Sequence, residues 1–284
     1  MKTSHIIWVG VFVTSSAYLL ASAPPELSST DASTSDARMI KTQNMLNAVN
    51  SINNTARTLY TKRIVGGGKA AGLKFGEDWA EPGVEKGPLP ALFLRIVSGR
   101  LETKPPQLGL YLGSDEPINK SNLFGGTQVQ AYEAVKATEA SVFMKDAEIG
   151  LVAMYPDFAS AGPCVTCHNE HTDSPKTDWV LGDVMGATTW TYPTDVVGAA
   201  DYLDTTEAFY DAVEEAYTMY LDKVRGFDPE LPIGSEWPEE GVLALPDAAT
   251  FMAEVRAQSA QYVISDLILD AQDKFDTLEI GEAQ

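Results

Sequence analysis

Basic residues are scarce in this sequence, which has 20 Lys and Arg against 40 Asp and Glu in 284 residues, a formal net charge of −20. Proteins that bind nucleic acids neutralise phosphates with clustered Lys and Arg. Nucleic acid is therefore excluded as an expected partner, and anionic membrane surfaces are disfavoured for the same reason. The imbalance is concentrated in residues 195–284, which hold 21 acidic and 4 basic residues. Hydrophobic residues make up 44% of the chain, a share typical of a protein with a packed core.

Long hydrophobic runs are also absent after the first residues, so no permanent membrane span is expected. Residues 1–23 combine Lys2, an apolar segment over residues 6–20 and the cleavage pattern Ala21-Ser22-Ala23. We predict a signal peptide at residues 1–23 and hence a periplasmic or secreted protein without stable membrane insertion after cleavage. An uncleaved N-terminal anchor is the alternative.

Cysteine is limited to Cys164 and Cys167, which excludes a disulfide-rich scaffold. Both lie in the run Cys164-Val165-Thr166-Cys167-His168, which is the C-x-x-C-H signature of c-type haem attachment. Two thiols at this spacing form thioethers with the two vinyl groups of one porphyrin, and His168 then becomes the proximal ligand of the iron. The motif predicts one covalently attached haem c. Because attachment follows export, the signal peptide supports this prediction.

Three other interpretations of the motif stay open. A disulfide between the two cysteines would close a very small loop and stabilise the fold little. A zinc site could add His168 and His171 to the thiols, although four ligands so close in sequence cannot easily surround one ion. A thioredoxin-like redox pair would need the motif at a strand-to-helix turn, which Gly162-Pro163 does not suggest.

Histidine is also scarce, with three residues in the chain, and one of them, His5, lies in the predicted signal peptide. The run over residues 63–67 resembles the activation junction of trypsin-like proteases, but both later histidines belong to the haem segment and no matching nucleophile motif occurs. No catalytic constellation is found, so we do not expect an enzyme. The glycines at positions 66–68 are interpreted as a flexible turn.

The same scarcity limits the sixth ligand of the iron. His171 follows His168 too closely to reach the opposite face of the porphyrin. Met154 and Met185 flank the motif on predicted strands and are the candidates for a weak sixth ligand. Tyr60, water or no ligand at all are the alternatives. A weakly held sixth position would leave ferrous iron open to small gases.

Further residues are candidates for contacting the haem. Propionates need cationic or hydrogen-bonding partners, and the candidates are Lys176, Arg63 and Arg95. Aromatic residues close enough in sequence to line the porphyrin are Tyr155, Phe158, Trp179 and Trp190.

Hydrophobic periodicity predicts helices over residues 39–60, 127–136, 205–225 and 247–275. Asp204 is the predicted N-cap of the helix over residues 205–225. Short apolar runs predict strands over residues 108–112, 148–155 and 184–192. The segment over residues 92–97 is apolar but of undecided type. Residues 24–38, rich in Pro, Ser, Thr and Asp, are expected to be a flexible linker. We therefore predict an α+β domain over residues 39–196, followed by an acidic, all-helical extension over residues 197–284.

Several sequence runs together resemble the bacterial extracytoplasmic c-type haem domains with a PAS-like fold, which are sensor modules. They are Met154–Asp157, Cys164–Asn169, Ser174–Trp179 and Gly182–Gly186, and Pro117–Asn122 resembles the Asn/Pro loop of that family. The resemblance covers about residues 39–196 and implies an antiparallel sheet flanked by helices, with His168 as an axial ligand. Some relatives use a cysteine of the N-terminal helix as sixth ligand, whereas this chain has no cysteine outside residues 164–167.

Two functions follow from these observations. The first is a sensor in which the haem responds to redox state or to a small gaseous ligand, with the helix over residues 39–60 as the switching element. The last 90 residues carry no kinase or cyclase signature, so a separate signalling protein is the expected partner. The second is a periplasmic electron carrier whose acidic surface steers it to a basic redox partner.

Overall fold

The computed structural model describes residues 39–103, 105 and 108–282. The predicted signal peptide and linker, residues 1–23 and 24–38, lie outside the described residues. Helices and antiparallel strands are mixed along the chain, and an antiparallel sheet is flanked by helices, so the prediction of an α+β fold is confirmed. No helix within the described ranges is both long and apolar enough to cross a membrane.

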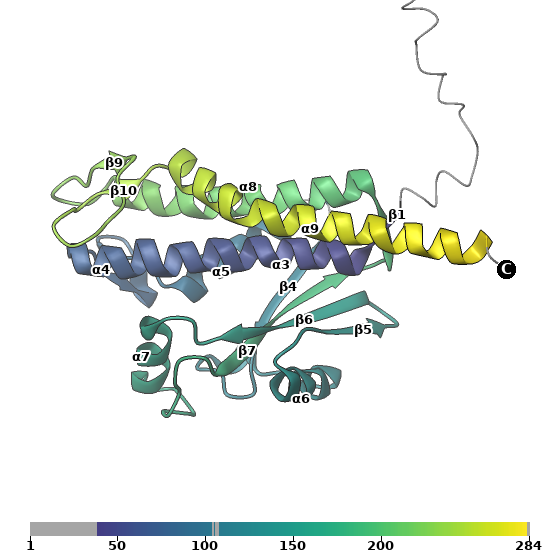
Figure 1. Ribbon diagram of the computed structural model, residues 1–284. Helices are drawn as coiled ribbons and strands as arrows, with labels where there is room; N and C mark the ends of the chain where they lie inside the picture. Colours follow the sequence, from purple (N-terminus) through teal and green to yellow (C-terminus); the bar gives the residue numbers. More distant parts are fainter. Residues whose placement is uncertain (1–38, 104, 106–107, 283–284) are drawn as a thin grey trace, which may run out of the picture. The chain divides into compact units, whose positions relative to one another are not determined.

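The central sheet has four antiparallel strands in the order β4-β7-β6-β5. Their bounds are Gly109–Gly113 for β4, Val142–Asp146 for β5, Gly150–Phe158 for β6 and Val184–Tyr192 for β7. Three of these strands agree closely with the strands predicted from sequence. Along β6, Ala153 and Tyr155 join the core on the side of helix α3 (Thr42–Leu59), whereas Met154 joins a cluster formed with α6 (Thr127–Thr138). The two helices therefore cover opposite faces of the sheet (Figure 1).

Helix α3 begins after the short strand β1 (Met39–Lys41), which pairs with β8 (Val196–Gly198). It continues through the π-helix η1 (Tyr60–Gly66) into α4 (Gly67–Ala71). The prediction of a flexible turn at residues 66–68 is therefore wrong. The helix ends instead at Gly72, whose φ of +102° lies in the left-handed region that favours glycine.

Tertiary packing explains why the glycine run is helical. Ile64 and Val65 of η1 are buried in the main core, so burial offsets the low helix propensity of the glycines that follow. Gly67 also permits a close approach of the chain, because a Cβ atom there would lie 2.1 Å from the carbonyl oxygen of Pro238. The glycines serve close packing at this point rather than flexibility.

The acidic C-terminal part of the chain completes the same core. Helix α8 (Ala199–Val224) packs against α5 (Pro90–Leu101), and α9 (Ala248–Glu282) packs against α3. One hydrophobic cluster runs from Ile40 to Val255. The core therefore continues across the boundary predicted after residue 196, through α8 and the first part of α9. The extension was predicted to be all-helical, but it also contains the short strands at Ile233–Gly234 and Leu245–Pro246.

The start of α8 also differs from the prediction. The helix begins at Ala199, six residues before the predicted start, and the carboxylate of Asp201 accepts a 3.1 Å hydrogen bond from the backbone N–H of Gly198. Asp204 therefore lies within the helix and is not its cap. The remaining short elements are β2 (Phe75–Gly76), η2 (Glu77–Ala80), β3 (Gly87–Pro88), η3 (Lys120–Asn122), β9 (Ile233–Gly234) and β10 (Leu245–Pro246).

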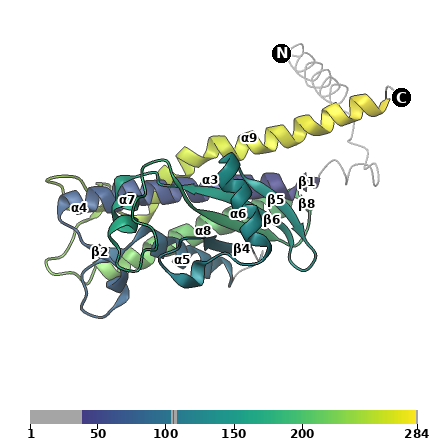
Figure 2. The ribbon, with the colours of Figure 1, turned by 90° about the horizontal axis from the view of Figure 1, so that it is seen from below.

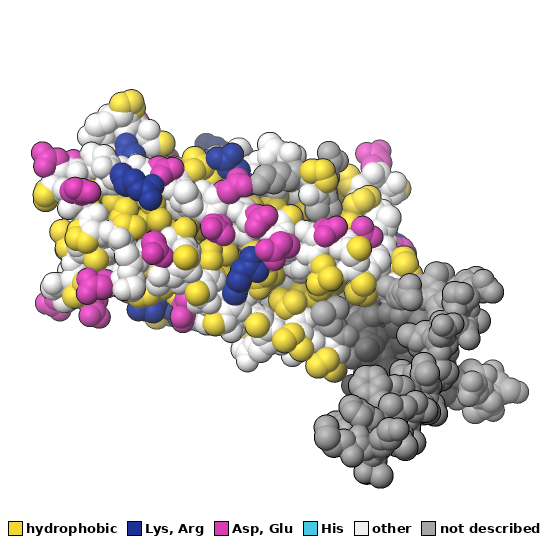
Figure 3. Space-filling model, turned by 90° about the horizontal axis from the view of Figure 1, so that it is seen from above, with side chains coloured by type: hydrophobic (Ala, Val, Ile, Leu, Met, Phe, Trp, Pro, Cys, Tyr) yellow, Lys and Arg dark blue, Asp and Glu magenta, His cyan; other side chains and the backbone are white. Residues whose placement is uncertain are grey.

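Acidic side chains are spread over the face seen from above, on the side of α8 and α9, and hydrophobic side chains lie between them (Figure 3). Glu207 of α8 pairs with Arg256 of α9 at 2.7 Å. Different elements lie beyond the two ends of the central sheet (Figure 1). The C-terminal half of α9 extends past the sheet at one end, and helix α7 (Gly162–Glu170) lies at the other (Figures 1 and 2).

Candidate functional site

The C-x-x-C-H motif lies on α7, which begins shortly after β6 ends. Pro163 stands in the first turn, where its missing N–H leaves no hydrogen bond unmade. The motif is therefore at a strand-to-helix turn after all, contrary to the sequence-based expectation. Cys164, Cys167 and His168 are three and four residues apart in one helix, so they share one side of it. Cys164 is thus the neighbour of both Cys167 and His168 along the helix.

The two thiols are free, with Cys164 half-buried and Cys167 exposed. Desolvation by neighbouring protein atoms raises the pKa of Cys167, and the nearby carboxylate of Glu77 raises it further. Thiols that act in redox pairs need a lowered pKa to form the thiolate. The surroundings of Cys167 therefore do not favour thioredoxin-like chemistry, even though the helix position would permit it.

His168 supplies a neutral imidazole beside these thiols. Burial lowers the pKa of His168, and the neighbouring His171 lowers it further, which favours the neutral imidazole that binds metal ions. Of its two ring nitrogens, Nδ1 is buried without a hydrogen-bond partner. Two free thiols and a neutral imidazole on one side of one helix fit the requirements of c-type haem attachment.

Asn169, the next residue, joins α7 to the loop that follows it. The Asn169 side chain accepts a 2.8 Å hydrogen bond from the backbone N–H of Trp179 and donates a 2.9 Å hydrogen bond to the Trp179 carbonyl. The indole of Trp179, 5% exposed, packs edge to face on the His168 ring with centroids 6.4 Å apart. The runs Cys164–Asn169 and Ser174–Trp179 are therefore in direct contact. The two Asn169–Trp179 hydrogen bonds act as a clamp that holds the indole against the imidazole of His168.

Lys176 stays close to this cluster. Its ammonium group lies 4.8 Å from the Trp179 ring centroid and donates a 2.5 Å hydrogen bond to Asp178. This hydrogen bond raises the pKa of Lys176, and Glu116 and Asp183 add to the effect. Lys176 is thus near the motif, as expected for a propionate partner, but it already has a carboxylate partner.

The structure does not bring Arg63 to α7, contrary to the prediction. Its guanidinium lies 4.0 Å from the ring centroid of Trp237, in the segment between β9 and β10. That segment and α7 lie on opposite sides of the α3–α4 helix (Figure 1). The stacking on an aromatic face directs the cation away from the motif. Arg95 lies exposed on α5.

Two candidates for lining the porphyrin, Tyr155 and Trp190, and the candidate oxygen ligand Tyr60 belong to the main core. The hydroxyl of Tyr155 donates to Asn47 at 2.6 Å, and the indole N–H of Trp190 donates to Asn50 at 3.0 Å, so both rings are held against α3. Tyr60 is fully buried, stacks on a phenyl ring of α5 and donates to a backbone carbonyl at 2.8 Å. Tyr60 is therefore not placed to serve as an oxygen ligand, because its hydroxyl already has a partner.

The two methionine candidates belong to different clusters of buried side chains. Met154 is fully buried in the cluster with α6, and α6 lies at some distance from α7 in both views (Figures 1 and 2). Met185 packs with Trp179, and Cys164 packs against the same cluster. Met185 is thus the methionine beside α7, and it shares with His168 a contact to the same indole.

Sequence reasoning missed the residues that connect the motif to the rest of the fold. Arg57 of α3 pairs with Asp157 near the end of β6 at 2.6 Å, and the hydroxyl of Thr188 donates to both carboxylate oxygens at 3.0 Å. This network ties the long helix to the strand that leads into α7. No local signal relates Arg57 to a partner 100 residues away. Glu77, which lies 3.7 Å from His171, was missed for the same reason.

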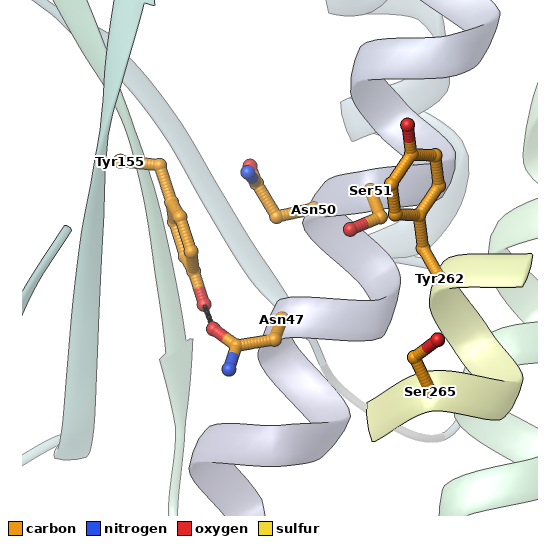
Figure 4. Close-up of a pocket in the computed structure, with 6 residues that line it drawn as sticks. All are labelled: Asn47, Asn50, Ser51, Tyr155, Tyr262 and Ser265. Atoms are coloured by element: carbon orange, nitrogen blue, oxygen red, sulfur yellow. Dashed lines mark hydrogen bonds between the residues drawn. The ribbon is translucent and has the colours of Figure 1, made fainter. Parts of the chain in front are cut away.

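Two hollows lie away from the motif. One of about 300 Å³ lies between α3, β6 and α9, and Figure 4 shows its lining residues Asn47, Asn50, Ser51, Tyr155, Tyr262 and Ser265. The Tyr155–Asn47 hydrogen bond spans part of it. The other, of about 430 Å³, lies between α5 and α8 and is lined mainly by carboxylates. Within the described ranges, no group of three or more His, Cys, Asp or Glu side chains is placed to hold a metal ion.

The fold and the site define an α+β protein with a C-x-x-C-H motif on a short helix beside an antiparallel sheet. The Tll0287-like family model matches residues 28–193, more than half of the chain, and the chain belongs to this family. Among solved structures, the crystal structure of the cyanobacterial heme-protein Tll0287 matches 52% of this chain and 91% of its own, with 15% sequence identity and a TM-score of 0.35. No curated protein matches the chain.

Proposed function

We propose that this protein is an exported c-type haem protein with one haem attached to Cys164 and Cys167, and with His168 as the axial ligand. The observation that carries the proposal is the placement of the two free thiols and the imidazole of His168 within the one helix α7, at the spacing of the C-x-x-C-H motif. Membership of a family named after Tll0287, itself described as a haem protein, supports it.

The residues of this chain have separable tasks in that function. A bound haem would supply an iron that changes its redox state or takes up a small ligand. Cys164 and Cys167 would hold the porphyrin, and His168 would hold the iron through a ring nitrogen. Asn169 and Trp179 would fix the rotation of the imidazole, as outer partners of metal ligands commonly do.

The response we propose is to redox state or to a small gaseous ligand. Supporting this, strong sixth ligands are scarce, since the chain has no cysteine outside residues 164–167 and its histidines other than His168 are His5 and His171. Among the weak candidates, Met154 packs with α6 and Tyr60 donates to a carbonyl in the core, whereas Met185 packs with Trp179 beside α7. The Arg57–Asp157 pair offers a route from the strand before α7 to α3, which is the element proposed to pass the signal to a separate protein.

An electron carrier is the second candidate function. One observation favours it, which is an exposed pair of aliphatic side chains, Val180 and Leu181, directly after Trp179. Neither function requires a catalytic group, and we do not propose an enzyme.

The cofactor is tested by producing the full chain together with the machinery that attaches haem c. The denatured protein should keep its haem, detected as a mass increase of one haem and by the pyridine haemochrome spectrum. The double variant Cys164→Ser with Cys167→Ser should lose all covalent haem. Haem that stays attached to this variant after denaturation, or a wild-type chain without covalent haem, would overturn the proposal.

A further inference from the structure

The turn over residues 180–183 displays two aliphatic side chains to solvent. Val180 is 59% exposed and Leu181 is 64% exposed, the largest exposure among the large hydrophobic side chains of the described residues. Scattered single hydrophobic residues are normal on protein surfaces, whereas contiguous apolar patches commonly mark interaction sites. The two side chains stay exposed only if the turn holds one conformation.

Hydrogen bonds fix the turn in this position. The backbone N–H of Val180 donates to the Asp183 carboxylate at 3.0 Å, and the N–H of Asp183 donates to the Val180 carbonyl at 3.2 Å. Ala159, just after β6, accepts from the N–H of Gly182 at 3.1 Å and donates to the Asp183 carbonyl at 2.8 Å. Gly182 has a φ of +96°, which favours glycine. The turn is therefore held at both ends, and the aliphatic pair stays outward.

The position of the turn connects it to the haem-attachment helix. Val180 follows Trp179, which is clamped to α7 by Asn169 and touches the ring of His168. A molecule resting on Val180 and Leu181 would thus lie one residue from a side chain in contact with the axial ligand. Electron exchange between proteins requires this kind of closeness between the partner and the redox group.

Carboxylates dominate the surface around the turn. Asp178 is 81% exposed, and the Asp183 carboxylate accepts from the backbone N–H of Val180. The backbone N–H of Glu116 donates to the Ser114 hydroxyl, which donates to the carbonyl of Met185, a neighbour of Trp179. Lys176 is the basic residue of this group, and its charge is paired with Asp178. The aliphatic pair therefore has a negative rim, which complements a cationic partner and repels a second copy of this acidic chain.

We propose that Val180 and Leu181, with the surrounding carboxylates Asp178 and Glu116, form the docking surface for a basic redox protein. This inference rests on the proposed haem function and names the partner chemistry of that same site. An apolar centre of two side chains with a charged rim matches a small, transient contact, as in electron-transfer encounters.

The test uses the full haem-loaded protein and, as probe, a basic cytochrome c whose iron is replaced by zinc. Binding is followed by the fluorescence anisotropy of the zinc porphyrin, and electron transfer by quenching of its triplet state by the ferric haem. The double variant Val180→Ser with Leu181→Ser should weaken binding and lower the bimolecular quenching constant by about tenfold, since hydrophobic anchors at an interface centre carry much of its affinity. Haem content, absorption spectrum and reduction potential should not change.

Leu203→Ser is the matched control, because Leu203 is 60% exposed on α8. It should leave binding and quenching as in the wild type. The variant Glu116→Gln with Asp178→Asn should slow association at low salt and flatten its dependence on salt, because screening removes the same attraction. Equal effects of the serine changes at Leu203 and at the turn, or no effect at either, would overturn the docking surface.

Two further outcomes are separated by this design. Concentration-dependent self-association of the wild type that disappears in the turn variant would assign the surface to a second copy and overturn the proposal of a basic partner. Anisotropy reports docking even on a chain without haem, so the loss of covalent haem would contradict the proposed function alone, and unchanged anisotropy in the turn variant would contradict the docking surface alone.

Discussion

The side-chain amide of Asn169 makes two hydrogen bonds to the backbone of Trp179, one as acceptor and one as donor. These bonds close a loop of ten residues onto α7 and place an indole against the imidazole of His168. The geometry explains why an asparagine directly after the C-x-x-C-H motif and a tryptophan ten residues later belong to one site.

Replacing Asn169 should loosen this loop. Asn169→Leu removes both hydrogen bonds and leaves backbone groups of Trp179 without their partners, which should lower the free energy of unfolding by about 1–3 kcal/mol. Asn169→Asp keeps the acceptor for the Trp179 N–H and should lose less. Urea unfolding followed by tryptophan fluorescence measures both. Equal stability of the leucine variant and the wild type would show that the clamp contributes nothing.

Carbon monoxide should bind the ferrous protein readily, because the sequence offers no cysteine outside the motif, and no histidine besides His5 and the adjacent His171, as a strong sixth ligand. A shift of the main haem absorption band on adding carbon monoxide measures this. Met185→Ala should leave the shift in place, and Met154→Ala serves as the matched control from the cluster with α6. A low-spin spectrum that carbon monoxide does not change, in the wild type and in both variants, would reveal a strong ligand and favour the electron carrier.

The start of α9 should make stability depend on pH through Asp247. Its carboxylate accepts a 2.8 Å hydrogen bond from the backbone N–H of Thr250, and this bond lowers the pKa of Asp247 below its usual 3.8. A lowered folded-state pKa stabilises the fold above the unfolded-state pKa, and this stability is lost as the pH falls through the folded value. Asp247→Ala should therefore lower the Tm at pH 7, and the difference from the wild type should shrink below pH 3.8.

Asn caps helices as well as Asp does, so Asp247→Asn provides the control. At pH 7 its Tm should equal that of the wild type, because the amide keeps the cap. Position 247 of this variant should add no pH dependence to the Tm between about pH 5 and pH 2, the range around the usual Asp pKa, because an amide does not titrate there. A deficit of the alanine variant that stays constant over the same range would exclude the carboxylate as the source of the effect.

Two glycine-to-alanine changes in helices should have opposite effects. Gly67→Ala places a Cβ atom 2.1 Å from the Pro238 carbonyl oxygen, so the connector must move and the Tm should fall. At Gly99 in α5, a Cβ atom meets nothing within 4 Å, and Gly99→Ala should stabilise by about 0.5–1 kcal/mol through helix propensity. Thermal unfolding of the two variants side by side measures the difference. A Gly67→Ala variant as stable as Gly99→Ala would contradict the close approach.

Much of the fold is encoded in local patterns. The strands at residues 108–112, 148–155 and 184–192 and the helix at residues 127–136 agree with the structure to within a few residues, because alternation and periodicity report directly on which face is buried. The glycines at 66–68 show the limit of such reasoning. Their propensity predicts a turn, and the burial of neighbouring residues makes a helix.

The motif of the site and its chemistry can be predicted from the sequence, because Cys164, Cys167 and His168 are close along the chain and come from neighbouring positions of one helix. The surroundings of the motif depend on tertiary packing. It directed Arg63 to Trp237, packed Met154 with α6 and Met185 with Trp179, and joined the acidic C-terminal helices to the same core. These relationships connect residues far apart in sequence, and their partners are chosen by packing and charge in three dimensions, which no local pattern records.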